Sequence, residues 1–516
     1  MRVLLVRPAC NERFGLGPFF RVEPLGMEYI AAALLAHGHE VQLADLRFTA
    51  PLETLLRRFR PRMVGVANMH AVDIPAAGEL VRAVKRHDGG IFTLVGGHSA
   101  ASYPRPHLCR DVDAICVDDG EATVPELADA LEAHRPLTEV RGLLLRAGNG
   151  AKGQADRGSQ QVVFEPSATR EAPISLDETP LPARHLVERY QRHYLVVQKN
   201  PLYGVETARG CPFRCSFCSI WRLMSRTFRC RGIDAVCRDM ASTGANVFIV
   251  DDLFWHPRAR SAELGRELVR RGHRKDWVLV QTRLDTVARG AEQLEAWLPV
   301  ARDFDIFFGF EAPTDRQLQH LDKDFDVKLV EEGVRVAREH RYGITGNFVV
   351  DPDWDEHDFQ AMWDLVARLQ LTRVGYTILT PLPGTPMWDE MAHRIVEHDF
   401  SKYDMHHILY EPRLGRRRFF ELFTQSWKRN VLSPTFSLTS WLRWIRQVRW
   451  SQLLLLARTI YQTQRIVRVD AYLKEAFPLD AALPLQFPAA PGVPDSAARV
   501  EASGSCPSCG ADLEHG

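Results

Sequence analysis

The sequence lacks an excess of charge of either sign, because Lys plus Arg and Asp plus Glu each number 65. Without a basic or acidic bias, nothing in the composition favours nucleic acid or a polyanionic partner. Long apolar runs are also missing: the opening stretch MRVLLVRP is too short for a signal peptide, and runs such as residues 29–36 are too short to cross a bilayer. We therefore expect a cytoplasmic protein that does not bind nucleic acid.

Cysteine is scarce, with 10 residues in a chain of 516, yet three of them lie close together in the stretch RGCPFRCSFCSIW, residues 209–221. Because cytoplasmic thiols stay reduced, this grouping favours metal or redox chemistry over disulfides. Cys211, Cys215 and Cys218 can hold three corners of a 4Fe-4S cluster and leave the fourth iron open to a substrate or cofactor. Closure of that corner by Cys230 or Cys237, or a zinc site that uses one of them, is the alternative.

The length of the chain predicts two or three domains. Residues 1–145 alternate short β-branched runs with helical patterns, which predicts an α/β domain with a doubly wound, Rossmann-like parallel sheet. Ligands of such sheets bind beyond the carboxyl ends of the strands. The candidate residues at the predicted strand ends are Asn68, His70, Gly96, Gly97, His98, Ser99, Gly120 and Glu121. The alternative is that these small residues only form tight turns.

Residues 146–190 are polar and rich in glycine and proline, which predicts a linker, with a hairpin whose second strand is VVFE. A second βα series follows in residues 191–400, with six apolar strand patterns separated by helical ones. Six such units predict a partial (β/α)6 barrel with its chemistry at the carboxyl-terminal rim. The cysteine loop follows the first of these strands.

Residues 401–484 are predicted to be mostly helical, and residues 435–469 contain six arginines and no acidic residue. Trp441 and Trp444 lie there at helical spacing, so this segment either contacts a membrane surface or packs on the barrel. Residues 485–516 are predicted to form a disordered tail. Cys506 and Cys509 in that tail are half of a zinc ribbon, or part of a site shared with a partner.

The stretch CPFRCSFC is identified as the signature of the radical S-adenosylmethionine (SAM) enzymes. The resemblance implies that Cys211, Cys215 and Cys218 hold a 4Fe-4S cluster whose open iron chelates the amino and carboxylate groups of SAM. Further stretches resemble other motifs of this family, in order along the predicted strands. They are FIVDD (Asp251, Asp252) near the SAM amino group, QTRLD (Arg283) near its carboxylate, GFE (Glu311) near its ribose, GITGNFVV (Gly346) near its adenine, and PLPGTP after strand six.

Residues 1–145 resemble the cobalamin-binding domain found in one subgroup of this family, through RVEPLGMEYIAAAL, VGVANMH, LVGGHSA and DDGEATVPEL. The loop RPACNERFG lacks the Asp-x-His-x-x-Gly motif that supplies a histidine to cobalt in mutases. The resemblance therefore implies cobalamin without that ligand, with His70 and His98 as neighbours.

The combined resemblance implies a C-methyltransferase for an unactivated carbon, in which a 5'-deoxyadenosyl radical removes hydrogen and methylcobalamin supplies the methyl group. The stretches RYGITGNFVVDPDWDEHDF and DMHHILYEPRLG resemble the hopanoid C-3 methyltransferases. This implies a hopanoid lipid substrate, an electron donor such as ferredoxin or flavodoxin, and contact with the inner face of the membrane. The alternatives are an oxidative cyclase acting on a porphyrin ester, a methylase of another substrate, and a non-catalytic cobalamin or redox sensor.

Overall fold

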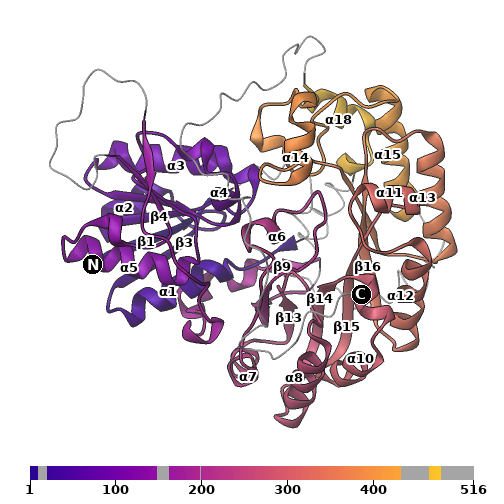
Figure 1. Cartoon of the computed structure of the whole chain (residues 1–516), viewed down its shortest axis with the longest axis horizontal. Coiled ribbons are helices and arrows are strands. Elements are labelled where there is room, and N and C mark those ends of the chain that lie inside the picture. Colours follow the sequence, from indigo (N-terminus) through magenta and orange to yellow (C-terminus); the bar gives the residue numbers. More distant parts are fainter. Residues whose placement is uncertain (10–19, 148–161, 198, 432–463, 478–516) are drawn as a thin grey trace. The chain divides into compact units, whose positions relative to one another are not determined.

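The computed structural model describes residues 1–9, 20–147, 162–197, 199–431 and 464–477 (Figure 1). They form two compact units. Unit 1 comprises Met1–Asn11 and Val22–Tyr194, and unit 2 comprises Glu12–Arg21 and Leu195–Gly516. Each unit is built around its own β-sheet.

Unit 1 contains a seven-stranded sheet in the order β3-β1-β4-β5-β6-β7-β8. The parallel strands are β1 (Arg2–Arg7), β3 (Glu40–Asp45), β4 (Met63–Ala67), β5 (Phe92–Gly96) and β6 (Ala114–Cys116). β7 (Leu143–Arg146) and β8 (Phe164–Pro166) continue the sheet in antiparallel pairing. The strand order reverses between β1 and β4, the position at which such sheets bind ligands. The predicted Rossmann-like fold is confirmed.

The helices of unit 1 cover both faces of this sheet (Figure 1). α2 (Leu52–Phe59) and α3 (Ile74–His87) pack on Leu4, Val64 and Val95 in one core cluster. α1 (Leu25–Ala36) packs against α5 (Gly120–Glu132). Strands buried on both faces consist of nearly continuous apolar residues, as in VLLV of β1.

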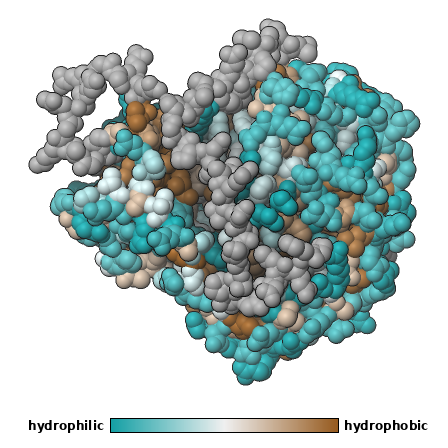
Figure 2. All heavy atoms as spheres, viewed as in Figure 1, coloured by the Kyte–Doolittle hydropathy of each residue, from teal (hydrophilic) through white to brown (hydrophobic). Residues whose placement is uncertain are grey.

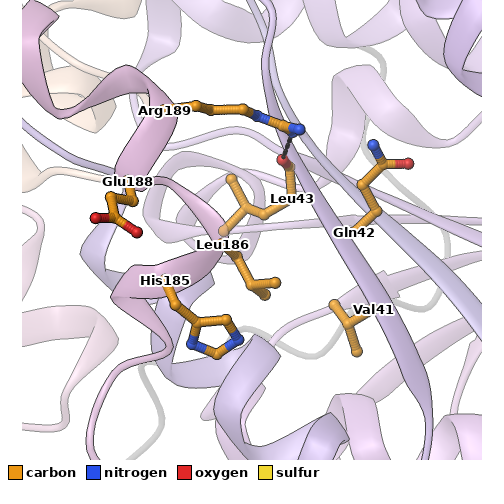
Figure 3. A pocket seen from close by; sticks show the side chains of 7 residues that line it. All are labelled: Val41, Gln42, Leu43, His185, Leu186, Glu188 and Arg189. Atoms are coloured by element: carbon orange, nitrogen blue, oxygen red, sulfur yellow. Dashed lines mark hydrogen bonds between the residues drawn. The ribbon is translucent and has the colours of Figure 1, made fainter.

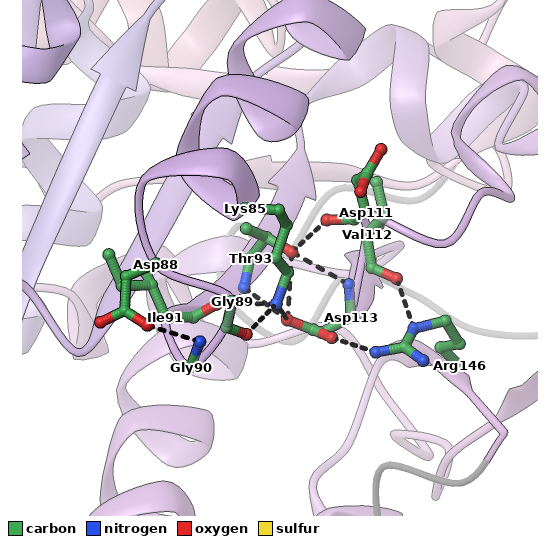
Figure 4. Close-up of polar contacts among 10 residues, drawn as sticks. All are labelled: Lys85, Asp88, Gly89, Gly90, Ile91, Thr93, Asp111, Val112, Asp113 and Arg146. Atoms are coloured by element: carbon green, nitrogen blue, oxygen red, sulfur yellow. Dashed lines mark hydrogen bonds and ion pairs between the residues drawn. The ribbon is translucent and has the colours of Figure 1, made fainter. Parts of the chain in front are cut away.

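A buried ion cluster fastens the amino-terminal edge of the sheet (Figure 4). The carboxylate of Asp113, which is 4% exposed, accepts hydrogen bonds from Lys85 Nζ, from Arg146 Nη2 and, at 2.9 Å, from the backbone N–H of Thr93. These bonds lower the pKa of Asp113 despite its burial, so the carboxylate stays charged. The cluster joins α3, β5, β6 and β7 at the edge opposite to the candidate residues.

The segment predicted as a linker is largely part of unit 1. β8 pairs with β7, and later residues return to the first helix and the edge strand β3. The backbone N–H of Ala183 donates to Glu28 O at 3.1 Å, Arg189 Nη2 donates to Leu43 O at 2.9 Å, and Tyr194 OH contacts Asp45 Oδ2 at 3.3 Å. These contacts cover a sheet edge that would otherwise expose unpaired backbone groups. A recess on this covered edge is lined by Val41, Gln42, Leu43, His185, Leu186, Glu188 and Arg189 (Figure 3).

Unit 2 contains a six-stranded sheet in sequential order, with every adjacent pair parallel. The strands are β10 (Leu202–Val205), β13 (Asn246–Ile249), β14 (Lys275–Thr282), β15 (Ala301–Glu311), β16 (Gly343–Val350) and β17 (Val374–Ile378). β10 and β17 are the two ends of this strand order, so the sheet is an open, partial barrel as predicted.

Helices follow the strands of unit 2. They include α7 (Ile233–Ser242), α8 (Arg258–Arg270), α9 (Leu284–Ala288), α10 (Ala291–Trp297), α11 (Asp315–His320), α12 (Val327–Glu339) and α13 (Glu356–Arg368). α12 buries Val330, Val334 and Ala337 at helical spacing, and its charged residues lie on the outer side. The face of unit 2 visible in Figure 2 is accordingly mainly hydrophilic, with small hydrophobic patches.

α14 (Pro386–Met391) follows the last strand, and the described part of the C-terminal region contains α15 (Arg416–Val431) and α18 (Val469–Glu475), with turns and irregular chain over residues 403–415. The tryptophans at 441 and 444 and the cysteines at 506 and 509 lie outside the described residues, as does most of the loop RPACNERFG. Within the described ranges, no helix is both long and apolar enough to cross a membrane.

Candidate active site

The cysteine loop leaves the sheet of unit 2 at its carboxyl edge. After β10, the short strand β11 (Ala208–Gly210) pairs antiparallel with β12 (Phe228–Cys230), and the loop between them carries all three cysteines. Gly210 has φ +102°, and a Cβ atom there would lie 2.1 Å from the backbone oxygen of Thr227. The loop therefore starts at a position that only glycine can occupy.

The three thiols lie in a protein environment that opposes their ionisation. Cys215 is buried, and Cys211 and Cys218 are partly buried. Burial raises the pKa of Cys211 to about 11 and that of Cys218 to about 12, and the charge of Cys215 adds to both increases. Such thiols become ligands when a bound cation displaces their protons. Three sulfur donors on one loop fit a thiolate-ligated iron–sulfur cluster.

Two buried cations face Cys215. Arg283 Nη1 lies 3.9 Å from Cys215 Sγ, and Lys323 Nζ forms an ion pair of 2.9 Å with Glu311 Oε1. Burial raises the pKa of Cys215, and the charges of Lys323 and Arg283 offset part of this increase. Among the described residues, no three or more His, Cys, Asp or Glu side chains converge on a single point where they could hold one metal ion. A 4Fe-4S cluster takes one cysteine at each of three different irons, so it does not require such convergence.

The residues of the predicted SAM site come from the ends of consecutive strands. Asp251 and Asp252 follow β13, Arg283 follows β14, and Glu311 ends β15. Because these strands are parallel, the structure brings the four residues to the same edge as the cysteine loop. Their contacts with SAM stay a prediction.

The two aspartates hold the cysteine loop against the sheet. Asp251 is buried, and its carboxylate accepts hydrogen bonds from the backbone N–H of Thr207 at 2.6 Å and from its hydroxyl at 2.5 Å. Asp252 accepts a bond of 2.9 Å from the backbone N–H of Gly210, directly before the first cysteine. Both side chains thus fix the entry to the loop.

Asp251 predicts a pH dependence of stability. Burial raises its pKa to about 7, so folding favours the protonated carboxyl, and this contribution is lost as the pH increases from the unfolded pKa through about 7. Asn keeps a hydrogen-bonding amide in place of the protonated acid. Between about pH 5 and about pH 8, we expect the free energy of unfolding of wild type to fall by about 3 kcal/mol through this group. We expect Asp251→Asn to lack this decrease, because the amide does not titrate. Urea denaturation of the metal-free protein at both pH values checks this, and equal pH dependence in variant and wild type would contradict it.

Glu311 and Gly346 show two local constraints. Glu311 has φ +61° at a β-bulge, and a Cβ atom on Gly309 would lie 2.1 Å from its Oε1. A Cβ atom on Gly346 would lie 2.4 Å from Phe308 O and 2.5 Å from the ring of Phe310. Gly346 is therefore required by close packing of neighbouring strands, and its contact with an adenine stays a prediction.

Three residues of this site were not predicted from the sequence. Lys323 lies in the loop after α11, Asp285 in the first turn of α9, and Phe213 inside the cysteine loop itself. The short spacing of Arg283 and Asp285 in QTRLD was a signal for a pair. Lys323 gave no such signal, because its partner Glu311 is on another element.

In unit 1, Asn68, Gly96 and Gly97 lie together at the carboxyl ends of β4 and β5. The backbone N–H of Asn68 donates to Gly96 O at 2.6 Å, and a Cβ atom on Gly97, which has φ +112°, would lie 2.7 Å from Asn68 O. Asn68 Nδ2 lies 3.0 Å from His107 Nε2. Burial lowers the pKa of His107 to about 4, so the neutral ring accepts this bond. The side chain of Asn68 is thereby fixed.

The two candidate histidines lie near these strand ends. His70 is exposed, as is its neighbour Met69, which is 46% exposed. His98 and Ser99 begin α4 (His98–Ser102), directly after Gly97. Burial lowers the pKa of His98 to about 4, and the nearby His70 adds to the decrease, so His98 is neutral at neutral pH. Neutral imidazole can accept a hydrogen bond or bind a metal.

Gly120 and Glu121 lie in the first turn of α5. A Cβ atom on Gly120 would lie 2.8 Å from Ile30 Cδ1, so this glycine allows α5 to pack closely on α1. Glu121 is buried. The observed need for Gly120 is helix packing, and its contact with cobalamin stays a prediction.

Residues 18–128 match the B12 binding domain family, which confirms the predicted cobalamin-binding domain. The hopanoid C-3 methylase of Methylococcus capsulatus is 29% identical over 78% of this chain and 75% of its own length. The anaerobic magnesium-protoporphyrin IX monomethyl ester cyclase of Cereibacter sphaeroides is 28% identical over 80% of this chain and 67% of its own.

Two solved structures share the fold. The radical SAM methyltransferase TsrM from Kitasatospora setae, solved with cobalamin and a [4Fe-4S] cluster, has a TM-score of 0.59 at 19% identity, covering 76% of this chain and 77% of its own. The cobalamin-dependent radical SAM enzyme OxsB, solved with aqua-cobalamin, has a TM-score of 0.65 at 16% identity, covering 90% and 72%. The chain therefore contains a B12 binding domain, and its partial barrel, which carries three cysteines at its rim, shares the fold of these cobalamin-dependent radical SAM enzymes.

Proposed function

We propose that this enzyme methylates an unactivated carbon of a hopanoid lipid, at C-3. The observation that carries the proposed chemistry is the loop with three buried or half-buried thiols at the carboxyl edge of the barrel sheet, faced by Arg283 and Lys323. An unactivated carbon has no acidic hydrogen, so acid–base chemistry alone cannot functionalise it. Such a reaction requires a cofactor that removes a hydrogen atom.

The residues of unit 2 would hold and shield the cofactors. Cys211, Cys215 and Cys218 would bind the cluster, and the bonds from Gly210 to Asp252 and from Thr207 to Asp251 would keep their loop in place. When bound, the cluster supplies the electron that cleaves SAM, and cobalamin supplies the methyl carrier.

The strand ends of unit 1 would bind cobalamin. Asn68 is fixed by His107, and Gly97, whose Cβ atom would meet Asn68 O at 2.7 Å, lets the chain turn tightly over this strand end. A large planar ligand can approach such a surface closely. His70 and the neutral His98 would be its polar neighbours.

The substrate is proposed from the relatives. The hopanoid C-3 methylase relative matches over most of both chains, and its name gives both the lipid class and the position. The cyclase relative makes oxidative ring closure of a porphyrin ester the second candidate function. The two functions differ in one measurable way, because only a methyltransferase leaves the SAM methyl group on its product.

The test uses full-length protein, reconstituted with iron, sulfide and cobalamin without oxygen. It is mixed with SAM labelled in the methyl group, reduced ferredoxin or flavodoxin, and a hopanoid in anionic liposomes. We expect labelled C-3 methylhopanoid and 5'-deoxyadenosine, detected by mass spectrometry, and we expect the protein to sediment with the liposomes less strongly at high salt.

Other outcomes would exclude the proposal. Ring closure of a porphyrin ester without label in the product would establish the cyclase, and label in a different compound would change the substrate. An absence of SAM cleavage by reduced, cluster-loaded protein would indicate a sensor. Equal sedimentation with neutral and anionic liposomes would contradict membrane contact through a basic segment.

A further inference from the structure

Arg283 is engaged on every side of its guanidinium group. Its Nε and Nη2 donate to the two carboxylate oxygens of Asp285 at 2.9 and 3.2 Å, and its Nη1 lies 3.9 Å from Cys215 Sγ. The guanidinium carbon lies 3.6 Å from the ring centroid of Phe213. The residue is 7% exposed. Its contacts therefore join β14, α9 and the cysteine loop.

This geometry fixes which atoms face the sulfur. A carboxylate that accepts two parallel bonds holds the plane of the guanidinium group, and the aromatic ring below prevents it from tilting. Nη1 is then the nitrogen directed at Cys215, since Nε and Nη2 are bound to Asp285. The ion pair of Arg283 and Asp285 has no net charge. It acts on Cys215 Sγ because its positive end, the guanidinium group, is directed at the sulfur.

A hydrogen bond to a cluster thiolate withdraws electron density from the sulfur. The oxidised cluster carries less negative charge than the reduced one, so such a bond stabilises the reduced form more and raises the reduction potential. Burial strengthens the effect, because little water screens it.

We propose that Arg283 is a positioning residue that donates a hydrogen bond to Cys215 Sγ and thereby raises the reduction potential of the cluster, with Asp285 and Phe213 holding it in place. The proposal rests on the proposed function in one respect, namely that the three cysteines bind a 4Fe-4S cluster. It differs from the role suggested by sequence resemblance, in which Arg283 contacts the SAM carboxylate.

The test compares wild type with Arg283→Met and with the double variant Arg283→Met/Asp285→Asn, which leaves no unpaired charge. Arg266→Met is the control, because that exposed arginine pairs only with the exposed Glu292 among its described contacts. Iron content, the midpoint potential from a redox titration followed by electron paramagnetic resonance, and SAM affinity are measured on each reconstituted protein.

We expect both Arg283 variants to keep the wild-type iron content, and their midpoint potential, measured without SAM, to move to a more negative value. The potential of Arg266→Met should equal that of wild type. An unchanged midpoint potential in both Arg283 variants would overturn the proposal. If their SAM affinity fell while the potential stayed unchanged, Arg283 would be a SAM-binding residue instead. So would failure of both variants to take up iron, because Arg283 would then only shape the loop. Wild-type protein that forms no cluster would instead refute the proposed function.

Discussion

Replacement of Cys215 by alanine is expected to abolish both cluster incorporation and methyl transfer. Cys215 is the central and most buried of the three thiols, and it alone contacts Arg283. Two remaining sulfur ligands leave two irons of the cube without a protein ligand, and such a cluster is not retained. Anaerobic reconstitution followed by iron and sulfide analysis should give about four irons per chain for wild type and close to none for the variant.

Cys237→Ala is the matched control for this experiment. Cys237 is buried as well, but it lies in α7, outside the cysteine loop. Alanine fits a helix, so this variant should lose some stability and keep its iron and its activity. Full activity of Cys215→Ala, or equal iron loss in both variants, would be inconsistent with a cluster held by the loop.

Replacement of Gly210 by alanine should have an effect of similar size on cluster incorporation. The added Cβ atom would lie 2.1 Å from a backbone oxygen, which no change of rotamer can relieve. Either β11 separates from β12, or Gly210 changes its φ of +102° and breaks its bond to Asp252. Both routes displace Cys211, the next residue. We expect iron content to fall several-fold while far-UV circular dichroism stays near that of wild type.

Gly272→Ala separates the effect of this clash from that of backbone strain. Gly272 also has a positive φ, +74°, but a Cβ atom there would have no neighbour within 4 Å. This variant should cost about 1 kcal/mol of stability and keep its iron. Wild-type iron content in Gly210→Ala would mean that the hairpin does not control the loop.

Much of the fold could be predicted from the sequence. The partial barrel has the predicted number and order of strands, although β10 overlaps the first predicted run only at its end, because apolar β-branched segments bounded by turns have few other stable arrangements. Residues 146–190, before the barrel, were predicted as a linker, but the described part of this segment packs in unit 1. Arg189 and Tyr194 contact β3, which is far away in the chain, and no local pattern reports such contacts.

In the candidate site too, residues with a local sequence signal could be predicted, and contacts between distant segments could not. The cysteine spacing gave the predicted cluster ligands, which stay a prediction, and the order of motifs along the strands placed Asp251, Asp252, Arg283 and Glu311 at one edge, as the structure has them. The partners of these residues could not be predicted. Thr207 donates to Asp251 because β10 pairs with β13 in the sheet. No local sequence pattern indicates this pairing.

The high pKa values of the cysteine thiols have a consequence for how the enzyme matures. Cys211 and Cys218 hold their protons above neutral pH in the metal-free protein, so each would have to release a proton in order to bind iron as proposed. Hydrogen ions therefore compete directly with iron for the loop. We therefore expect cluster incorporation to slow as the pH falls, because protonated thiols are poor ligands for iron.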